Sequence, residues 1–379
     1  MSKISSSAFA DTKPHYALLD GLRGVAALIV IWYHVFEAFA ASPVEQRVNH
    51  GFLAVDFFFI LSGFVIGYAY DDRWGTRLTL KDFFRRRLIR LHPMVVPACV
   101  LGVISFCIQG CETWEGTRVA FSCVMLAALM QMLMLPVWPG AAAEVRGAGE
   151  MYPLNGPSWS LFFEYIGNVL YALWLRRLST RALGCFVALA GAGLAAFALG
   201  NLSGFGNLGV GWTFAGDNFL GGMLRMTFSF SAGLLLSRVF RPRAVRGAFW
   251  ICSLVLVVLL ALPYMGDGSR PWMNALYEVV CVVAVFPLLV WLAASGRTTD
   301  ARSAAVCKFL GDISYPLYII HYPSIYLLFM ASRKYEMTFA DAWPYALLIF
   351  AGNILLAWVL LKIYDEPVRR WLTRVWMKR

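Results

Sequence analysis

Leu19–Phe36, LDGLRGVAALIVIWYHVF, is an apolar stretch long enough to enter a bilayer, yet it carries Asp20, Arg23 and His34. At about 100° per residue, His34 lies roughly 20° around a helix from Arg23, with Asp20 about 60° to one side and Glu37 about 40° to the other. The axial rise from Arg23 to His34 is about 16 Å, or half of a hydrocarbon core of ~30 Å. Because ionisable residues are costly in a membrane, this shared face predicts a functional site. A satisfied polar contact between packed helices is the alternative.

The whole chain is too apolar for a soluble domain of its size. Of its 379 residues, 60% are hydrophobic and 15% are charged, and the mean hydropathy is +0.64. This composition is typical of a polytopic helical membrane protein, so the lipid bilayer is an expected partner. The net charge of +11 does not indicate nucleic acid, because the basic residues occur in short runs between apolar segments. The eight cysteines contain no CxxC pair and the five histidines show no HExxH spacing, so no metal site is expected.

Apolar segments recur along the chain. They lie at about Leu18–Ala41, Gly51–Tyr70, Pro93–Gln109, Val119–Leu135, Ser158–Leu175, Ala182–Gly200, Phe219–Ser237, Ala248–Tyr264, Pro271–Ala294, Gly311–Met330 and Trp343–Ile363. The first one, with Lys3 and Lys13 before it and Ala38-Phe39-Ala40 after it, resembles a signal peptide. Its Trp32, His34 and Glu37 favour a retained first helix instead.

The basic runs orient these segments. The runs are Arg73–Arg90, Arg176–Arg181, Arg238–Arg246, Arg297–Lys308 and Lys362–Arg379. All are expected to be cytoplasmic, and so are both termini. Two membrane spans lie between each pair of successive basic runs, except between Arg90 and Arg176, where there are three candidate segments. One of Pro93–Gln109 and Val119–Leu135 is therefore expected not to cross.

The predicted fold is an all-α, polytopic membrane bundle of about ten helices. We expect a cytoplasmic tail at residues 1–17, one membrane domain at 18–364 and a basic cytoplasmic tail at 365–379. No soluble domain and no internal repeat is expected.

The stretch after the second segment, KDFFRRRLIRLHP at Lys81–Pro93, is basic and amphipathic. Arg86 and Arg90 are four residues apart and share a helix face. One interpretation is an interfacial helix attracted by anionic lipid. The other is a clamp for an anionic ligand, because arginine matches phosphate geometry.

Further polar residues lie inside other apolar segments. Asp56 is expected to pair with Arg23 or His34, unless it lies near the outer interface. Gly63 and Gly67 favour close helix packing. Glu164, near the start of its segment, suggests the lining of a polar cavity.

Near the end of the chain, SYPLYIIHYP at Ser314–Pro323 places Tyr318 and His321 on one helix face. Aromatic residues often anchor helices at membrane interfaces, so this pattern favours packing over catalysis for His321.

These motifs, in their order, resemble the acyltransferase-3 family of integral membrane O-acyltransferases. The resemblance rests on Leu19–Arg23 (LDGLR), the spacing of Arg23 and His34, Val55–Phe64 (VDFFFILSGF), Phe84–Pro93, Trp159–Glu164 (WSLFFE), Ser314–Pro323 and Tyr364–Pro367 (YDEP). It implies about ten helices with cytoplasmic termini, and transfer of an acyl group, usually acetyl from acetyl-CoA, to a hydroxyl of a carbohydrate or surface glycan. The sequence departs from the family at FFEY, where a second acidic residue often follows the glutamate, and this puts a paired-carboxylate role in doubt.

The resemblance and the residue chemistry imply one mechanism. Arg86 and Arg90, together with Arg85 and Arg87, bind the phosphates of CoA at the cytoplasmic face. His34 acts near the membrane midplane as a general base or a transient acyl carrier. Asp20, Glu37 or Asp56 orients it, and the sequence contains no Gly-x-Ser-x-Gly motif.

The expected site residues form three groups. The catalytic ones are His34, Arg23, Asp20 and Glu164, the CoA-binding ones are Arg85, Arg86, Arg87 and Arg90, and the supporting ones are Asp56, Ser62, Glu37, Tyr318 and His321. No bound cofactor is expected, and acetyl-CoA or another acyl-CoA is the expected donor. The expected location is the bacterial inner membrane, with glycan-assembly proteins as partners.

Two other functions fit the same residues. A proton-coupled transporter could use the face with Arg23 and His34 as a relay. A scaffold in a glycan-assembly complex would tolerate loss of His34.

Overall fold

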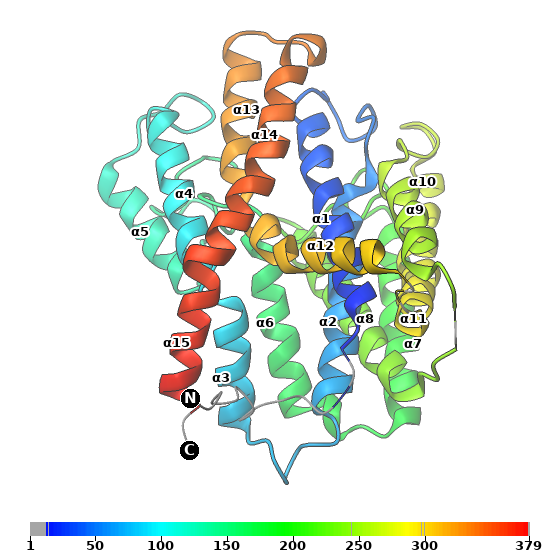
Figure 1. Ribbon diagram of the computed structural model, residues 1–379. Coiled ribbons are helices and arrows are strands. Elements are labelled where there is room, and N and C mark those ends of the chain that lie inside the picture. The colour runs from blue at the N-terminus through cyan, green and yellow to red at the C-terminus, as the bar shows by residue number, and fades with distance from the viewer. Residues whose placement is uncertain (1–12, 14, 244, 297, 299, 378–379) are drawn as a thin grey trace.

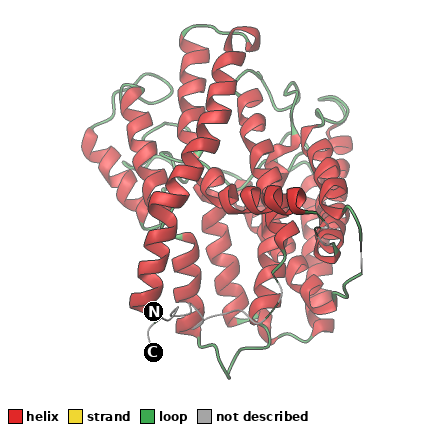
Figure 2. Ribbon diagram, in the orientation of Figure 1, coloured by secondary structure: helices red, strands yellow, loops and turns green. Residues whose placement is uncertain are grey.

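The computed structural model describes residues 13, 15–243, 245–296, 298 and 300–377 (Figure 1). These residues form helices joined by loops, with no strand among them (Figure 2), so the predicted all-α fold is confirmed. The α-helices are α1 (Ala17–Glu37), α2 (Ala54–Tyr70), α3 (Leu80–Leu91), α4 (Val95–Ile108), α5 (Phe121–Met132), α6 (Ser158–Leu173), α7 (Thr180–Leu199), α8 (Asn218–Val239), α9 (Ala248–Ala261), α10 (Pro271–Val280), α11 (Phe286–Ser295), α12 (Ala301–Ile320), α13 (Tyr322–Lys334), α14 (Phe339–Leu360) and α15 (Glu366–Trp376). Short 3₁₀-helices occupy His50–Leu53 and Leu175–Arg177, and π-helical turns occupy Cys281–Val285 and Leu361–Asp365. Most of the predicted N-terminal tail (1–17), with Lys3 of the signal-peptide alternative, and the last two residues of the predicted C-terminal tail (365–379) lie outside the described residues.

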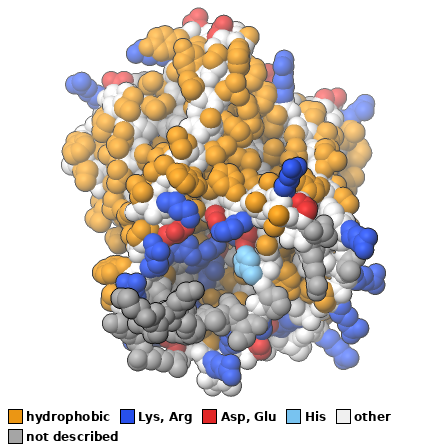
Figure 3. Space-filling view, viewed as in Figure 1, with side chains coloured by type: hydrophobic (Ala, Val, Ile, Leu, Met, Phe, Trp, Pro, Cys, Tyr) orange, Lys and Arg blue, Asp and Glu red, His pale blue; other side chains and the backbone are white. Residues whose placement is uncertain are grey.

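Many of these helices are long and apolar enough to cross a membrane. Among the described residues there are seven such stretches: Ala17–Glu37, His50–Tyr70, Leu80–Ile108, Thr180–Leu199, Asn218–Val239, Pro271–Ser295 and Phe339–Trp376. Large apolar side chains cover most of the face above α12 in Figure 3. The protein is therefore a multi-pass integral membrane protein, and the total of about ten spans stays a prediction.

Contacts of the basic runs with one another, or with residues just before another run, bring the runs to one end of the bundle, which we call the basic end. These contacts are Arg238 with Asp71 (2.7 Å) and with the Leu178 carbonyl (2.7 Å), Arg85 with the Trp376 carbonyl (3.0 Å), and the backbone bridge between Val245 and Gly296. In Figure 3, Lys and Arg side chains gather below α12. This arrangement agrees with the prediction that the runs share one side of the membrane.

The predicted span Gly311–Met330 is wrong, because the chain turns sharply within it. α12 lies across the bundle and ends at Ile320, whereas α13 stands upright (Figure 1). Pro323, in the first turn of α13, lacks a backbone N–H and cannot continue the hydrogen bonding of α12. His321 occupies the break as the C-cap of α12 and the N-cap of α13.

The sequence predicted that either Pro93–Gln109 or Val119–Leu135 does not cross the membrane. α5, in the second segment, is a shorter helix than α4, in the first. Its 12 residues give a length of about 18 Å, well below the ~30 Å of a hydrocarbon core. α3 and α4 instead follow each other in the 29-residue stretch Leu80–Ile108. α3 stands upright below α4 in Figure 1, so it does not form an interfacial helix on the lipid surface.

The prediction of close packing at Gly63 and Gly67 is confirmed by the contact between α2 and α8. A Cβ atom at Gly63 would lie 2.0 Å from the Phe230 carbonyl oxygen, and one at Gly67 would lie 2.1 Å from Oγ of Ser237. On α8, a Cβ at Gly233 would lie 2.0 Å from the Ile60 carbonyl oxygen. Glycine on both helices lets the two backbones touch.

Candidate active site

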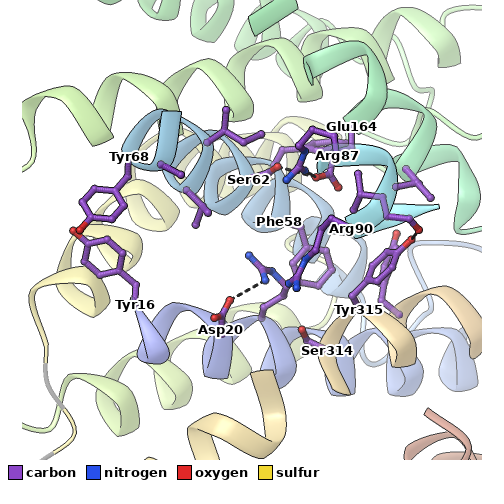
Figure 4. Close-up of a pocket in the computed structure, with 18 of the residues that line it drawn as sticks. Tyr16, Asp20, Phe58, Ser62, Tyr68, Arg87, Arg90, Glu164, Ser314 and Tyr315 are labelled. Carbon is purple, nitrogen blue, oxygen red and sulfur yellow. Dashed lines mark hydrogen bonds and ion pairs between the residues drawn. The ribbon is translucent and has the colours of Figure 1, made fainter. Parts of the chain in front are cut away.

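A cavity of about 360 Å³ opens between α1, α2, α3, α6 and α12 (Figure 4). Its lining includes many of the residues that the sequence singled out: Asp20, Arg23, Ser62, Arg86, Arg87, Arg90, Glu164 and Tyr318. Side chains that lie up to several hundred positions apart in the chain therefore meet in one place.

Arg90 extends into this cavity (Figure 4), whose lining also includes Arg23. Its side chain is exposed to the open space, and within the described part of the chain it makes no hydrogen bond or ion pair. The guanidinium group carries five N–H donors in a planar fork. Arg90 is therefore available to bind an anion.

Other charges in the cavity are paired. Nη1 of Arg23 lies 2.9 Å from Oδ1 of Asp20, and Nη2 of Arg87 lies 2.6 Å from Oε1 of Glu164. Ser62 also donates to Glu164, at 2.8 Å. Glu164 thus lines a polar cavity, as predicted.

Positive charge exceeds negative charge in the lining. The basic side chains are Lys13, His15, Arg23, Arg86, Arg87 and Arg90, and the acidic ones are Asp20 and Glu164. His15, just before α1, lies 2.7 Å from Asp20, and this hydrogen bond raises the pKa of His15 above its usual range. The excess of positive charge favours a ligand with several negative charges.

Arg85 does not line this cavity, unlike the other three arginines that the sequence analysis grouped with it. It donates to the carbonyl of Trp376 at the end of α15, so it links α3 to the C-terminal helix. The helical period explains the difference, because Arg86 and Arg90 share one face and Arg85 lies about 100° away from Arg86.

His34 lies on α1 beyond the inner end of the cavity and is not part of its lining. Its Nδ1 atom is 2.6 Å from Oε2 of Glu37, one turn further along the same helix. An ionised carboxylate only accepts hydrogen bonds, so Nδ1 carries the hydrogen and Nε2 keeps a free lone pair. Of the three acids expected to orient His34, the structure selects Glu37, since Asp20 pairs with Arg23 and His15.

Comparison with known proteins identifies the family of this chain. A family model described as an acyltransferase domain, acyltransferase-3, matches residues 16–362. The chain belongs to the acyltransferase-3 family. It is therefore a membrane-bound acyltransferase, and the transporter and scaffold alternatives are set aside.

Relatives of this acyltransferase carry consistent names. It is 26% identical to acyltransferase MdmB of Streptomyces mycarofaciens, over 94% of this chain and 92% of that protein. It is 27% identical to the putative membrane-bound transacylase BcsY of Komagataeibacter xylinus, over 82% of this chain and 74% of that protein. A shorter match, 39% identical over 23% of this chain and 13% of the relative, is to the peptidoglycan O-acetyltransferase OatA of Listeria monocytogenes. No solved structure gives a significant match.

The acyltransferase contains a buried ion pair that the sequence prediction missed. Asp56 contacts neither Arg23 nor His34, which corrects the prediction, and instead pairs with Arg225 of α8 at 2.7 Å. Both side chains are fully buried, and Arg225 also donates to the carbonyls of Val210 and Phe52. An arginine inside the apolar segment Phe219–Ser237 was the signal for this pair, because a charge there needs a partner.

His321 also lies in an unexpected place. It is fully buried, rather than at an interface, and its ring stacks on that of His34, with centroids 5.5 Å apart and planes 28° apart. Tyr318 lines the cavity, and its hydroxyl lies 2.7 Å from Oγ of Ser160. The acyltransferase therefore places Tyr318 and His321 between the cavity and His34.

Proposed function

We propose that this acyltransferase moves an acyl group, acetyl in the simplest case, from cytoplasmic acyl-CoA to a hydroxyl of a carbohydrate or cell-surface glycan. The observation that carries the proposal is the unpaired Arg90 inside a basic cavity whose inner end approaches the His34–Glu37 pair. CoA is a polyanion with a long arm, and it matches a charged entrance that leads to an apolar interior.

The charged residues along the cavity have different roles. Arg86, Arg87 and Arg90 bind the phosphates, with Arg90 as the direct contact because no side chain among the described residues pairs with its guanidinium. Arg23, held by Asp20, lies further along α1 toward His34 and adds positive charge beside the arm of the donor. Glu164 holds Arg87 in place.

His34 is the general base for the acceptor hydroxyl. Glu37 fixes the imidazole tautomer and stabilises the imidazolium that forms when Nε2 accepts the hydroxyl proton. An acyl acceptor reaches His34 from the side opposite the basic end, which makes donor and acceptor approach from the two sides of the membrane.

Location and acceptor class follow from the same reasoning. The basic end faces the cytoplasm of a bacterium, and the inner membrane is the site of action. One relative is named a peptidoglycan O-acetyltransferase, and this name supports a cell-envelope glycan as acceptor. Glycan-assembly proteins deliver this acceptor to the enzyme.

The test is CoA binding and CoA release by the purified protein in detergent. With acetyl-CoA as probe, Arg90→Ala is expected to weaken binding about 10- to 100-fold, because it removes a charge-assisted contact. His34→Ala is expected to bind the donor normally and to lose acyl transfer.

Arg85→Ala is the matched control, because Arg85 is on the same helix but outside the cavity. The proposal is wrong if CoA binds none of these proteins, or if Arg85→Ala and Arg90→Ala weaken binding equally.

A further inference from the structure

The inner end of the cavity is closed before His34. Tyr318 and Ser160 are hydrogen-bonded there, and Phe58 packs edge-on against Tyr318 with ring centroids 5.2 Å apart. A thioester in the cavity therefore meets Tyr318 first, and His34 lies behind it.

His321 lies between Tyr318 and His34. Its ring centroid is 6.0 Å from that of Tyr318 on one side and 5.5 Å from that of His34 on the other. The break between α12 and α13 fixes its position, because its backbone caps both helices. No other imidazole lies between the cavity and His34 within the described residues.

The hydrogen bonds of His321 leave one ring nitrogen free. Nδ1 lies 2.8 Å from the carbonyl oxygen of Tyr318, and because a carbonyl only accepts, Nδ1 carries the hydrogen. Nε2 is then a bare lone pair, and it is fully buried with no hydrogen-bond partner in the described part of the chain. Leaving a buried acceptor without a hydrogen bond is destabilising, so the fold retains this atom at a cost in stability.

The two histidines are therefore chemically different. Glu37 stabilises a proton on His34, which suits a base. No carboxylate is hydrogen-bonded to His321 in the described residues, so its imidazole stays neutral and its lone pair suits a nucleophile.

We propose that His321 carries the acyl group between the two substrates, an inference that rests on the proposed function. Nε2 of His321 attacks the thioester carbonyl carbon, the C–N bond forms and the C–S bond breaks. The sulfur leaves with the bonding electrons as CoA thiolate, which takes a proton from water in the cavity. The acyl-imidazolium keeps its Nδ1 hydrogen on the Tyr318 carbonyl.

The second step returns both histidines to their starting state. The acceptor oxygen attacks the acyl carbon while its proton passes to Nε2 of His34. The C–N bond breaks, its electrons return to His321, and His34 releases the proton to solvent. Donor and acceptor never need to share one pocket, which fits a cavity that closes before His34.

Access to His321 requires Tyr318 to turn away from Ser160. That motion breaks the hydrogen bond with Ser160 and changes the ring contacts of Tyr318 with Phe58 and His321.

Isotope exchange tests the carrier directly. Labelled CoA is mixed with acetyl-CoA and the purified protein without any acceptor, and label appearing in acetyl-CoA reports reversible acylation of the enzyme. Wild type and His34→Gln are expected to exchange at similar rates, because exchange needs no acceptor base. His321→Asn is expected to lose exchange by at least about 100-fold, while binding CoA normally.

Asparagine retains an N–H that can reach the Tyr318 carbonyl, so His321→Asn preserves the capping contact, and unchanged CoA affinity reports a folded donor site. His321→Gln is the second variant. Exchange that persists in both variants, exchange that is lost only in His34→Gln, or acyl transfer by wild type without exchange each overturns the carrier role and leaves the proposed function intact. Absence of CoA binding in wild type instead removes the proposed function.

Discussion

At the scale of single residues, the hydrogen bond between His34 and Glu37 decides which imidazole nitrogen is free. Both residues lie on α1, so their contact is set by the helical repeat alone. His34 is 17% exposed and Glu37 34% exposed, which leaves the pair accessible from one side.

Glu37→Gln is expected to lower the rate of acyl transfer about 100-fold or more with little change in donor affinity. The neutral amide of the Glu37→Gln variant can still hydrogen-bond to Nδ1 of His34, but it does not stabilise the positive charge of the His34 imidazolium. Transfer rates and CoA affinity of the purified variants check this. Glu45→Gln, at an exposed position of the loop after α1, is the control. Equal rates for the two variants would contradict the role of Glu37.

Glu150, in the loop between α5 and α6, predicts a pH dependence of stability. Burial raises the pKa of Glu150 to about 7, although Arg146 and the hydroxyl of Tyr326 act in the opposite direction. Between the ordinary value of 4.5 and about 7, the folded protein binds more protons at this site than the unfolded chain does. Its contribution to stability is thus present at low pH and lost as the pH rises through this window.

The amide in the Glu150→Gln variant does not titrate, so the variant is expected to lack the loss of stability that Glu150 causes as the pH rises. The difference in Tm between variant and wild type should grow by about 3–5 °C from pH 4.5 to 7.5. Thermal unfolding in detergent at a series of pH values measures it. Glu115→Gln, at an exposed site, should follow the wild type, and identical profiles for all three proteins would refute the prediction.

At the scale of helices, the contact of α2 with α8 depends on glycine. Both helices also share the buried pair Asp56–Arg225, so one interface combines close backbone packing with an intramembrane charge pair. Breaking such a pair by removing one partner costs about 3–5 kcal/mol, because the other charge stays buried.

Gly63→Val is expected to lower Tm strongly, since its side chain would overlap the Phe230 carbonyl and force the helices apart. Gly184→Ala is the matched control, because this glycine also lies in a helix and a Cβ there meets nothing within 4 Å. It should be neutral or slightly stabilising. Thermal unfolding of both variants checks the prediction, which fails if Gly63→Val keeps the wild-type Tm.

At the scale of the whole molecule, the basic runs gather at one end although they are far apart in sequence. That asymmetry orients the protein in the membrane. Under the proposed function, the same asymmetry puts the cavity on the cytoplasmic side, where CoA is available.

Cysteine labelling in intact cells tests this orientation. In a background where Cys107, Cys111, Cys123 and Cys185 are replaced by serine, a membrane-impermeant maleimide should label Ser203→Cys, in the loop between α7 and α8. It should label Thr76→Cys, in the loop between α2 and α3, only after lysis. The reverse pattern would place the cavity on the outside and exclude cytoplasmic CoA as donor.

Much of the fold follows from the sequence because it depends on local properties. The apolar length of the segments, the shared face of Arg23 and His34, and the glycine pair on α2 are fixed by helical geometry, and the basic runs determine which segment ends lie together. The spacing of Arg86 and Arg90 in the same way predicted two residues of the cavity lining.

Tertiary structure decided what depends on register between distant segments. The sequence predicted Arg23 or His34 as the partner of Asp56, and only the packing of α2 on α8 shows that the partner is Arg225, 169 positions away. Helix periodicity predicted one span at Gly311–Met330, and only the packed bundle shows that the chain turns there and that α12 lies across the bundle. The break at His321 then brings this side chain onto His34. The helical repeat determines which residues share a face. Which other helix packs against that face depends on contacts that form only when the whole bundle packs.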